Sequence, residues 1–298
     1  MHTATAQLRA TTYKAPAKIN LTLHVCGRRT DGYHLLDSLV VFTNIGDRIT
    51  VAESDVLHLD VTGPYSDKLS SGPDNLILRA ARLLQNVTGC RKGAHICLEK
   101  NLPLSSGIGG GSSDAAATLH GCSELWKVDP AQISNARLAA ELGADLPVCF
   151  HRQTAFMSGI GEILDAAPPL PTFWLVLANC GRPLATKSVF ATLSKFSPPL
   201  ARESFNRLSN AATLAAALKN HRNDLASSAI TLEPSIASTL ATLENTPGCL
   251  IAQLSGSGPT CFGLFADEQA ARHAAAFIES RQPTWWVAPT KVLSAPRA

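Results

Sequence analysis

The segment 103–113, PLSSGIGGGSS, carries the residue types of a phosphate-binding loop. It holds four glycines, four serines and no charged residue, and the alanine-rich run 114–119 that follows predicts a helix. Glycines let a backbone approach a ligand closely, and a helix N-terminus offers free N–H groups and the positive end of the helix dipole. The segment therefore predicts phosphate binding. A flexible Gly/Ser linker is the less favoured alternative, because Leu-Pro-Leu and an apolar-faced helix flank the loop.

This loop matches neither of the common nucleotide-binding motifs. Ser112 follows the last glycine, where a P-loop requires lysine. Ser134 and Asn135 stand about 20 positions on, where a dinucleotide-binding fold requires an acidic residue. A cation that helps to bind phosphate must therefore come from elsewhere in the chain.

Lys18 and Asp145 are the candidates for the chemistry. Phosphoryl transfer requires that the phosphates be held, their charge offset and the acceptor hydroxyl deprotonated. Lys18 heads a predicted strand and could supply charge, while Asp145 lies in an apolar stretch and could accept a proton. Two alternatives stay open: a solvated lysine at a strand end, and an aspartate that caps a short helix starting at Pro147.

Two further segments carry side chains or backbone suited to a ligand. The turn 31–34 ends in Tyr33 and His34, which can stack and form hydrogen bonds, although an ordinary hairpin turn is the alternative. The segment 254–260, LSGSGPT, is a second glycine loop, with a plain β-turn as its alternative. Two glycine loops in one chain favour a single anionic ligand facing both.

Alternating strands and helices must position these residues. We expect strands over 18–25, 35–43, 48–52, 95–99, 155–157, 173–178, 249–255, 261–265 and 285–287. We expect helices over 74–85, 112–126, 129–143, 187–195, 203–219, 222–230, 234–244 and 268–279. The first strand should be half-buried, with Ile19, Leu21, Leu23 and Val25 on its apolar face. The pattern predicts an α+β protein of two lobes, residues 1–167 and 168–298, divided at the proline-rich stretch 166–171.

Composition limits the class of protein. The formal charge of +3 and the scarcity of basic clusters argue against nucleic-acid binding. No apolar run reaches 18 residues, so no membrane-spanning helix is expected. The eight cysteines form no CxxC pair and the nine histidines show no metal-ligand spacing, so we expect free thiols, a cytoplasmic protein and no metal site. Residues 1–17 predict a disordered tail, with a transit peptide as the alternative.

Three motifs in fixed order resemble the GHMP kinases, the small-molecule kinases named for galactokinase, homoserine kinase, mevalonate kinase and phosphomevalonate kinase. They are 15–21 (APAKINL), the loop 103–113 and the loop 254–260. Further segments are similar to one branch of that family: 74–77 (DNLI), 109–116 (GGGSSDAA), 142–147 (LGADLP) and 159–162 (GIGE). The resemblance spans 14–293.

The resemblance implies a two-lobed GHMP kinase fold. Its N-terminal lobe would be similar to the second domain of ribosomal protein S5, its C-terminal lobe ferredoxin-like, and the site would lie between them. The branch it resembles transfers the γ-phosphoryl group of ATP to the 2-hydroxyl of 4-diphosphocytidyl-2-C-methyl-D-erythritol, in the non-mevalonate route to isoprenoid precursors. Mg²⁺ is expected with ATP, although no dedicated carboxylate for it is evident. The partners would be these small molecules alone, and the protein a monomer or weak homodimer.

For the nucleotide, the resemblance implies that the loop backbone wraps the phosphates, with Asn75 and Lys100 on the adenine side. Asp145 would be the base, and Lys18 beside it would stabilise its charged form. The loop residues are Pro103, Leu104, Ser105, Ser106, Gly107, Ile108, Gly109, Gly110, Gly111, Ser112 and Ser113.

For the acceptor, the resemblance implies that Tyr33 and Phe190 sandwich the cytosine ring and that His34 reads its polar edge. The remaining contacts would come from Asn20, Thr186, Gly256, Ser257 and Gly258. The segment around Thr186 departs from the pattern, since Ala185 stands where the family carries proline.

Two rival functions are weighed against this one. The first is another GHMP kinase, acting on homoserine, mevalonate or a sugar; Tyr33 and His34 argue against it, because those acceptors have no base to stack. The second is a non-enzymatic RNA-binding module, suggested by the S5-like lobe and weakened by the lack of a basic cluster.

Overall fold

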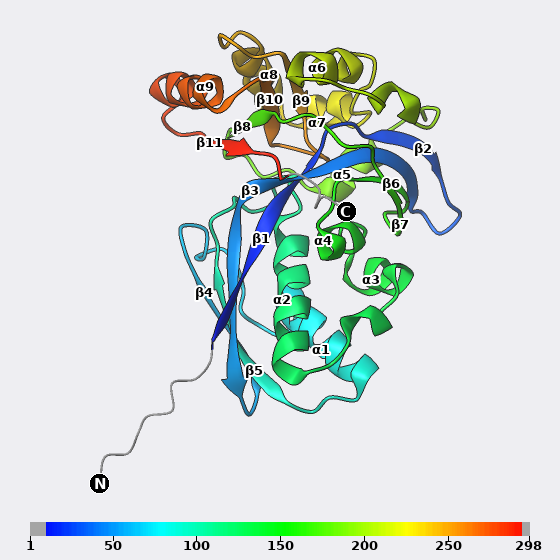
Figure 1. Ribbon diagram of the computed structural model, residues 1–298, viewed down its shortest axis with the longest axis vertical. Coiled ribbons are helices and arrows are strands. Elements are labelled where there is room, and N and C mark those ends of the chain that lie inside the picture. The colour runs from blue at the N-terminus through cyan, green and yellow to red at the C-terminus, as the bar shows by residue number, and fades with distance from the viewer. Residues whose placement is uncertain (1–9, 294–298) are drawn as a thin grey trace.

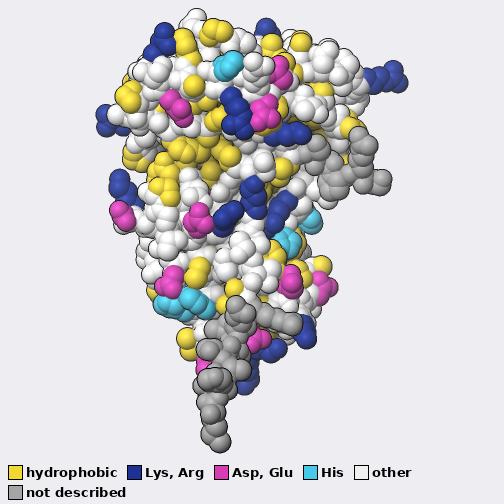
Figure 2. All heavy atoms as spheres, turned by 60° about the vertical axis from the view of Figure 1, so that its left-hand side comes forward, with side chains coloured by type: hydrophobic (Ala, Val, Ile, Leu, Met, Phe, Trp, Pro, Cys, Tyr) yellow, Lys and Arg dark blue, Asp and Glu magenta, His cyan; other side chains and the backbone are white. Residues whose placement is uncertain are grey.

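The computed structural model describes residues 10–293; the predictions for residues 1–9 and 294–298 lie outside the described residues. Two lobes, each built on its own β-sheet, lie one above the other in Figure 1. On the face shown in Figure 2, basic and acidic side chains are interspersed over both lobes. Among the described residues, no helix has the length and apolarity needed to cross a bilayer.

The lower lobe in Figure 1 holds most of a seven-stranded sheet with the order β4-β5-β3-β6-β7, to which β1 and β2 add by pairing with β3. Its strands are β1 (Thr11–Asn20), β2 (His24–Arg28), β3 (His34–Ser54), β4 (Leu57–Thr62), β5 (Gly93–Glu99), β6 (Ala155–Gly159) and β7 (Ile163–Ala166). The helices between β4 and β6 are α1 (Leu76–Thr88), α2 (Gly110–Trp126), α3 (Asn135–Leu142) and α4 (Leu146–His151), with a 3-10 turn at Pro130–Gln132.

The upper lobe is built on a four-stranded sheet with the order β11-β8-β10-β9. Its strands are β8 (Trp174–Asn179), β9 (Ile251–Leu254), β10 (Cys261–Phe265) and β11 (Trp286–Lys291). Its helices are α5 (Thr186–Ala191), α6 (Ala211–Lys219), α7 (Ala226–Leu232), α8 (Ser235–Glu244) and α9 (Glu268–Arg281), with a 3-10 turn at Arg202–Phe205. One core cluster contains Ile19 and Leu39 of the first sheet together with Leu175 and Phe262 of the second, so the lobes share packed apolar surface.

The long strand β3 organises the first sheet, because it pairs with β1, β2, β5 and β6. The prediction of two strands, 35–43 and 48–52, was wrong, since β3 runs unbroken through the residues between them. Partners in β1 supply the ladder there: Ala15 lies opposite Asp47 and Pro16 opposite Gly46. Gly46 is needed at this point, because a Cβ would lie 2.2 Å from the Ala15 carbonyl oxygen.

The predicted strand 18–25 was wrong in its bounds and in its half-buried character. β1 begins at Thr11 and ends at Asn20, so a disordered tail through residue 17 is also wrong for residues 11–17. Asn20 and Thr22, expected on a solvent face, are as buried as Ile19, because packing from both lobes covers both sides of this segment. A buried polar side chain needs hydrogen-bond partners, and Asn20 finds them in the site described below.

Two predicted helices were wrong because capping side chains divide them. Asp129 caps only the 3-10 turn at Pro130–Gln132, and Ser134 then starts α3 by accepting a hydrogen bond from the Arg137 N–H at 3.3 Å. The predicted helix 203–219 is a 3-10 turn followed by α6, because Asn210 forms a capping box with Thr213. Asparagine and serine favour such caps over helix interiors.

Candidate active site

Lys18, from β1, and Asp145, at the N-cap of α4, form an ion pair. The Lys18 Nζ donates to Asp145 Oδ1 at 2.9 Å and to Asn20 Oδ1 at 2.8 Å. The lysine side chain is 3 % exposed and the aspartate 35 %, so the ammonium is enclosed while the carboxylate reaches a cavity. Asn20 in turn donates through Nδ2 to Ser38 Oγ at 2.8 Å, which fixes its amide orientation. A carboxylate held by one buried cation, with a face open to a cavity, is positioned to accept a proton.

The side chain of Asp145 does not cap a helix, so the alternative interpretation from the sequence was wrong. Asp145 does occupy the N-cap position of α4, but it has helical backbone angles and its carboxylate makes no capping hydrogen bond. The carboxylate points instead to Lys18, which comes from β1. The backbone of Asp145 therefore begins α4, while its carboxylate pairs with Lys18 and does not cap the helix.

The glycine loop leads into α2, as the sequence predicted. Gly109 is the N-cap of α2 with φ of 65°. A Cβ on Gly109 would lie 3.1 Å from both Cβ and Cε of Lys18, so glycine allows the lysine to pass under the loop. The loop is also tied to β1, because the Lys18 N–H donates to the Ile108 carbonyl at 2.9 Å. The free N–H groups at the start of α2 therefore lie next to the Lys18–Asp145 pair.

The second glycine loop packs directly against the first. The Thr260 N–H donates to the Ser106 carbonyl at 3.2 Å, and Ser255 Oγ donates to the Gly107 carbonyl at 3.3 Å. A Cβ on Gly107 would lie 2.6 Å from the Gly258 carbonyl oxygen, so only a glycine permits this contact. Gly256 and Gly258 both pack against Gly107 of the first loop, and Gly256 and Ser257 also line a cavity.

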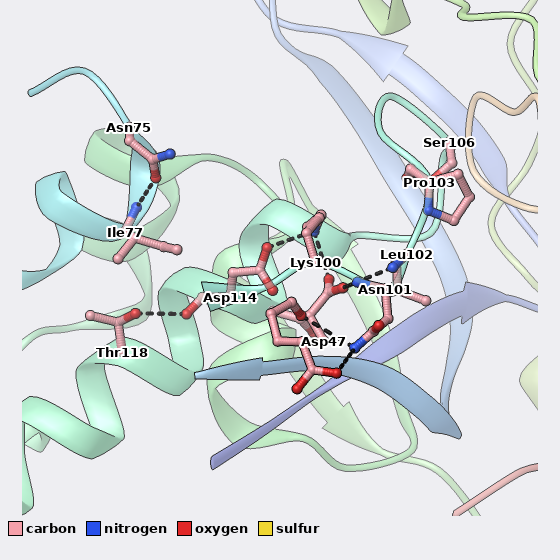
Figure 3. A network of polar contacts seen from close by, with 12 residues as sticks. Asp47, Asn75, Ile77, Lys100, Asn101, Leu102, Pro103, Ser106, Asp114 and Thr118 are labelled. Atoms are coloured by element: carbon pink, nitrogen blue, oxygen red, sulfur yellow. Dashed lines mark hydrogen bonds and ion pairs between the residues drawn. The ribbon is translucent and has the colours of Figure 1, made fainter. Parts of the chain in front are cut away.

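A buried cluster of three charges anchors the start of the loop (Figure 3). Lys100 Nζ lies 2.6 Å from Asp47 Oδ2 and 2.6 Å from Asp114 Oδ2. Asp47 also accepts hydrogen bonds from the N–H groups of Asn101 and Leu102, at 2.6 and 2.8 Å. The carboxylate of Asp47 thus holds β3, the end of β5 and the entry to the loop together.

The charges in this cluster do not balance, since two carboxyl groups share one ammonium. Burial alone lowers the pKa of Lys100, but Asp114 and Asp47 outweigh it and the net pKa is raised. Burial raises the pKa of Asp114 to about 8, Lys100 opposes that rise and Asp47 adds to it. Asp47 has three donors, whereas Oδ1 of Asp114 has no hydrogen-bond partner among residues 10–293. Of the two carboxyl groups, Asp114 is therefore the one that binds a proton more readily.

Two cavities meet at Asp145. The first, of about 610 Å³, is walled by the glycine loop, by Asn75 at the N-cap of α1 and by Lys100. The second, of about 710 Å³, is lined by side chains from both lobes. Both cavities share the same four lining residues: Gly107, Ser112, Asp145 and Thr186. A group bound in one cavity can therefore react with a group bound in the other across the Asp145 carboxylate.

The second cavity has an aromatic end. The rings of His34 and Phe190 stack with centroids 4.9 Å apart, and Tyr33, 50 % exposed, lines the same cavity. The turn that presents Tyr33 is closed by hydrogen bonds from the Arg29 N–H to the Tyr33 carbonyl and from the Tyr33 N–H to Asp31 Oδ1. Burial, and then the nearby Arg28, lowers the pKa of His34, so its ring is neutral at neutral pH. Thr186 joins the second loop, its hydroxyl 2.8 Å from Ser257 Oγ.

The sequence analysis did not identify several residues that line the two cavities. Arg28 and Lys187 line the second cavity and place cations there, and Phe196 adds another aromatic ring. The sequence analysis also missed Asp47 and Asp114. Asp114 did offer a signal: it is a charged residue in an alanine-rich, buried helical run, and such a residue needs a buried partner. A third cavity of about 520 Å³, lined by residues such as Tyr13 and His120, shares no lining residue with these two.

Two segments of the chain match models of a known protein family. Residues 75–153 match the family model of the GHMP kinases N terminal domain, and residues 200–283 match that of the GHMP kinases C terminal domain. The chain belongs to the GHMP kinase family. The resemblance drawn from the three sequence motifs is therefore confirmed, as is the α+β two-lobed fold of GHMP kinases.

Both curated relatives and solved structures are similar to this chain. A protein of Parvibaculum lavamentivorans, named 4-diphosphocytidyl-2-C-methyl-D-erythritol kinase, is 51% identical over 93% of this chain and 96% of its own length. A protein of Paramagnetospirillum magneticum with the same name is 50% identical over 94% and 98%. A crystal structure of 4-(cytidine 5'-diphospho)-2C-methyl-D-erythritol kinase superimposes with a TM-score of 0.74 at 32% identity, covering 95% of this chain and 99% of that one. The homoserine kinase of Cytophaga hutchinsonii, 15% identical with a TM-score of 0.72 and covering 100% and 98%, shares the GHMP kinase fold.

Proposed function

We propose that this chain is a kinase that transfers the γ-phosphoryl group of ATP to the 2-hydroxyl of 4-diphosphocytidyl-2-C-methyl-D-erythritol. The observation that carries the proposal is the Lys18–Asp145 pair at the junction of two cavities. The relatives with this name match nearly the whole chain, which supports the same acceptor here.

ATP would occupy the cavity walled by the glycine loop. The N–H groups at the start of α2 would hold the phosphates, and the dipole of this helix, Gly110–Trp126, would offset their charge. Asn75 would lie on the adenine side. The ammonium of Lys100 is already bonded to two carboxylates, so its contribution would be to hold the loop entry in place through Asp47.

The acceptor would occupy the aromatic cavity. Tyr33 and Phe190 would enclose the cytosine ring, and the neutral ring of His34 would form hydrogen bonds with its polar edge. Arg28 and Lys187 would face the diphosphate of the acceptor. Asn20 and Thr186 would then contact the alcohol end, which brings its hydroxyl to Asp145.

Asp145 would accept the hydroxyl proton while Lys18 offsets charge on the transferring group. For a loose transition state, the position of the base matters more than its strength. Mg²⁺ would be held mainly through the ATP phosphates and water, which suits its preference for few protein ligands. Ser112, Asp145 and Thr186, the three oxygen-bearing side chains that line both cavities, fit such a site. When bound, the ion would neutralise phosphate charge.

The test is a comparison of acceptors in an assay of ADP release. The cytidine diphosphate alcohol should be phosphorylated with a kcat/KM at least about tenfold above that of the same alcohol without the cytidylyl group, because stacking of a base on aromatic rings contributes roughly 1–3 kcal/mol. Equal values for the two acceptors would remove cytosine recognition and favour another GHMP kinase activity. Affinity for RNA without any ATP turnover would favour the binding module instead.

A further inference from the structure

Four side chains capable of binding a transition metal lie together on the first sheet, away from the two cavities described above. β4 and β5 pair in parallel, with His58 opposite His95 and Asp60 opposite Cys97. Side chains of a strand alternate between its two faces. The residues between these four, such as Leu59, are buried in the core, so the four share the solvent face of the sheet.

Contacts within this group are already short. His58 Nε2 lies 3.0 Å from Asp60 Oδ1, and His95 Nε2 lies 2.8 Å from Asp60 Oδ2. Cys97 Sγ lies 3.5 Å from His95 Nε2. One ligand atom from each of His58, Asp60 and His95 lies within 4.8 Å of the others, and this group of three does not include Cys97 Sγ, which approaches His95 alone. The carboxylate thus bridges two imidazoles, and a thiol approaches one of them.

The separation of His95 from Cys97 matches one edge of a tetrahedral metal site, and the two histidine nitrogens lie close to different oxygens of Asp60. Bonds of about 2.0 Å to nitrogen and oxygen and about 2.3 Å to sulfur place neighbouring ligand atoms about 3.3–3.6 Å apart. The nitrogen–sulfur separation of 3.5 Å already has that length, and the two nitrogen–oxygen separations need to open by only a few tenths of an ångström. The movement is small for side chains that are 40–60 % exposed.

We propose that this face of the sheet binds one Zn²⁺ ion through His58, Asp60, His95 and Cys97. The site goes beyond the proposed kinase activity and does not depend on it. It also goes against the expectation from the sequence, which found no metal-ligand spacing among the histidines.

The chemistry of the donors favours zinc over magnesium or calcium. Imidazole and thiolate suit Zn²⁺, whereas Mg²⁺ and Ca²⁺ prefer oxygen ligands alone. On binding, each histidine presents a neutral Nε2 and carries its proton on Nδ1, and the Cys97 thiol loses its proton to solvent.

The site lies on the opposite side of the sheet from the helices. Ala94, Ile96 and Leu98 of β5 face the core with residues of α1 and α2, whereas His95 and Cys97 face outward. Figure 2, in which the side of the molecule that carries β4 comes forward, shows exposed histidine side chains on this lobe. The zinc ion is therefore separate from any Mg²⁺ bound with ATP.

The test measures zinc affinity of the full-length protein by competition with a colorimetric chelator, in buffer that contains excess Mg²⁺. We expect one tightly bound equivalent in the wild type. His95→Gln and Asp60→Asn should each weaken zinc binding by more than about 100-fold, beyond the 10–100-fold loss that follows removal of an outer partner. His273→Gln on α9, which changes an exposed histidine far from the cluster in sequence, should leave the affinity unchanged.

Two readouts distinguish the site from nonspecific binding to other histidines and thiols. Zinc should raise the Tm of the wild type and of His273→Gln but not that of His95→Gln, because only a ligand of the folded state stabilises it. Substituted Co²⁺ should give a thiolate charge-transfer band that Cys97→Ser abolishes. Absence of stoichiometric zinc binding, equal affinity in His95→Gln, or a cobalt spectrum without that band would overturn the proposal. Loss of kinase activity in any variant bears on the proposed function and not on this site.

Discussion

The two cavities that meet at Asp145 differ in what lines them. The first is walled by the backbone of the glycine loop, which buried contacts hold in place. The second is lined by side chains from segments far apart in the sequence. The loop entry is anchored by Asp47, Lys100 and Asp114, all nearly inaccessible to solvent. The second cavity ends in Tyr33 and Phe196, which are 50 % and 51 % exposed. The proposed triphosphate site is therefore built on buried, rigid contacts, whereas the proposed acceptor site ends in exposed side chains.

Removing the buried cation should have the largest effect on the loop side. Lys100→Met leaves Asp47 and Asp114 buried without their counter-charge, so we expect a loss of about 3–5 kcal/mol in the free energy of unfolding. Denaturant unfolding measures it. Lys219→Met, at an exposed lysine of α6, should change stability by less than about 0.5 kcal/mol. Equal losses in the two variants would show that the buried cluster does not hold the loop.

A change at Asp145, which lines both cavities, should affect catalysis without affecting either site alone. Asp145→Asn keeps the shape of the side chain but removes the base, so we expect kcat to fall by about 100-fold or more. ATP affinity, measured by calorimetry, should stay within about twofold. Asp55→Asn, which alters an exposed carboxylate, is the matched control. Near-normal turnover of Asp145→Asn would show that this carboxylate is not the base.

On the acceptor side, Tyr33→Ala should separate the two substrates. Loss of one stacking surface should raise KM for the cytidylyl acceptor roughly tenfold or more, within the 1–3 kcal/mol of base stacking. KM for ATP should change little, because Tyr33 lines only the second cavity. Phe277→Ala on α9 removes another exposed ring and should change neither constant. If both KM values rose together in Tyr33→Ala, the division between the two cavities would fail.

The smallest expected effect compares two glycines of the loop. Gly109→Ala imposes a side chain at φ of 65° and within 3.1 Å of Lys18, so it should destabilise the protein by about 1–2 kcal/mol. Gly111→Ala places a methyl group in open space and should not destabilise it. Thermal unfolding of both variants tests the claim. Similar Tm values would show that the loop tolerates movement where we describe it as rigid.

Local patterns predicted much of this protein. The glycine loop and the helix after it, the apolar strands 173–178 and 261–265, and the two-lobed α+β fold all follow from short stretches of sequence, because glycine, caps and hydrophobic periodicity act within a few residues. Local patterns failed where partners outside the stretch decide. β3 is one strand because β1 pairs along it, and Asn20 is buried because two lobes pack around it.

The sequence by itself determined that a glycine loop leads into a helix, that a lysine and an aspartate are available, and to which family the chain belongs. Tertiary structure alone decided that Lys18 and Asp145, 127 positions apart, form one ion pair, and that Lys100 bonds to two buried carboxylates. It also placed His58 beside His95, through a parallel pairing that no spacing in the chain reveals. The physical reason is that strand register and close packing depend on the whole chain at once, whereas propensity depends only on neighbours.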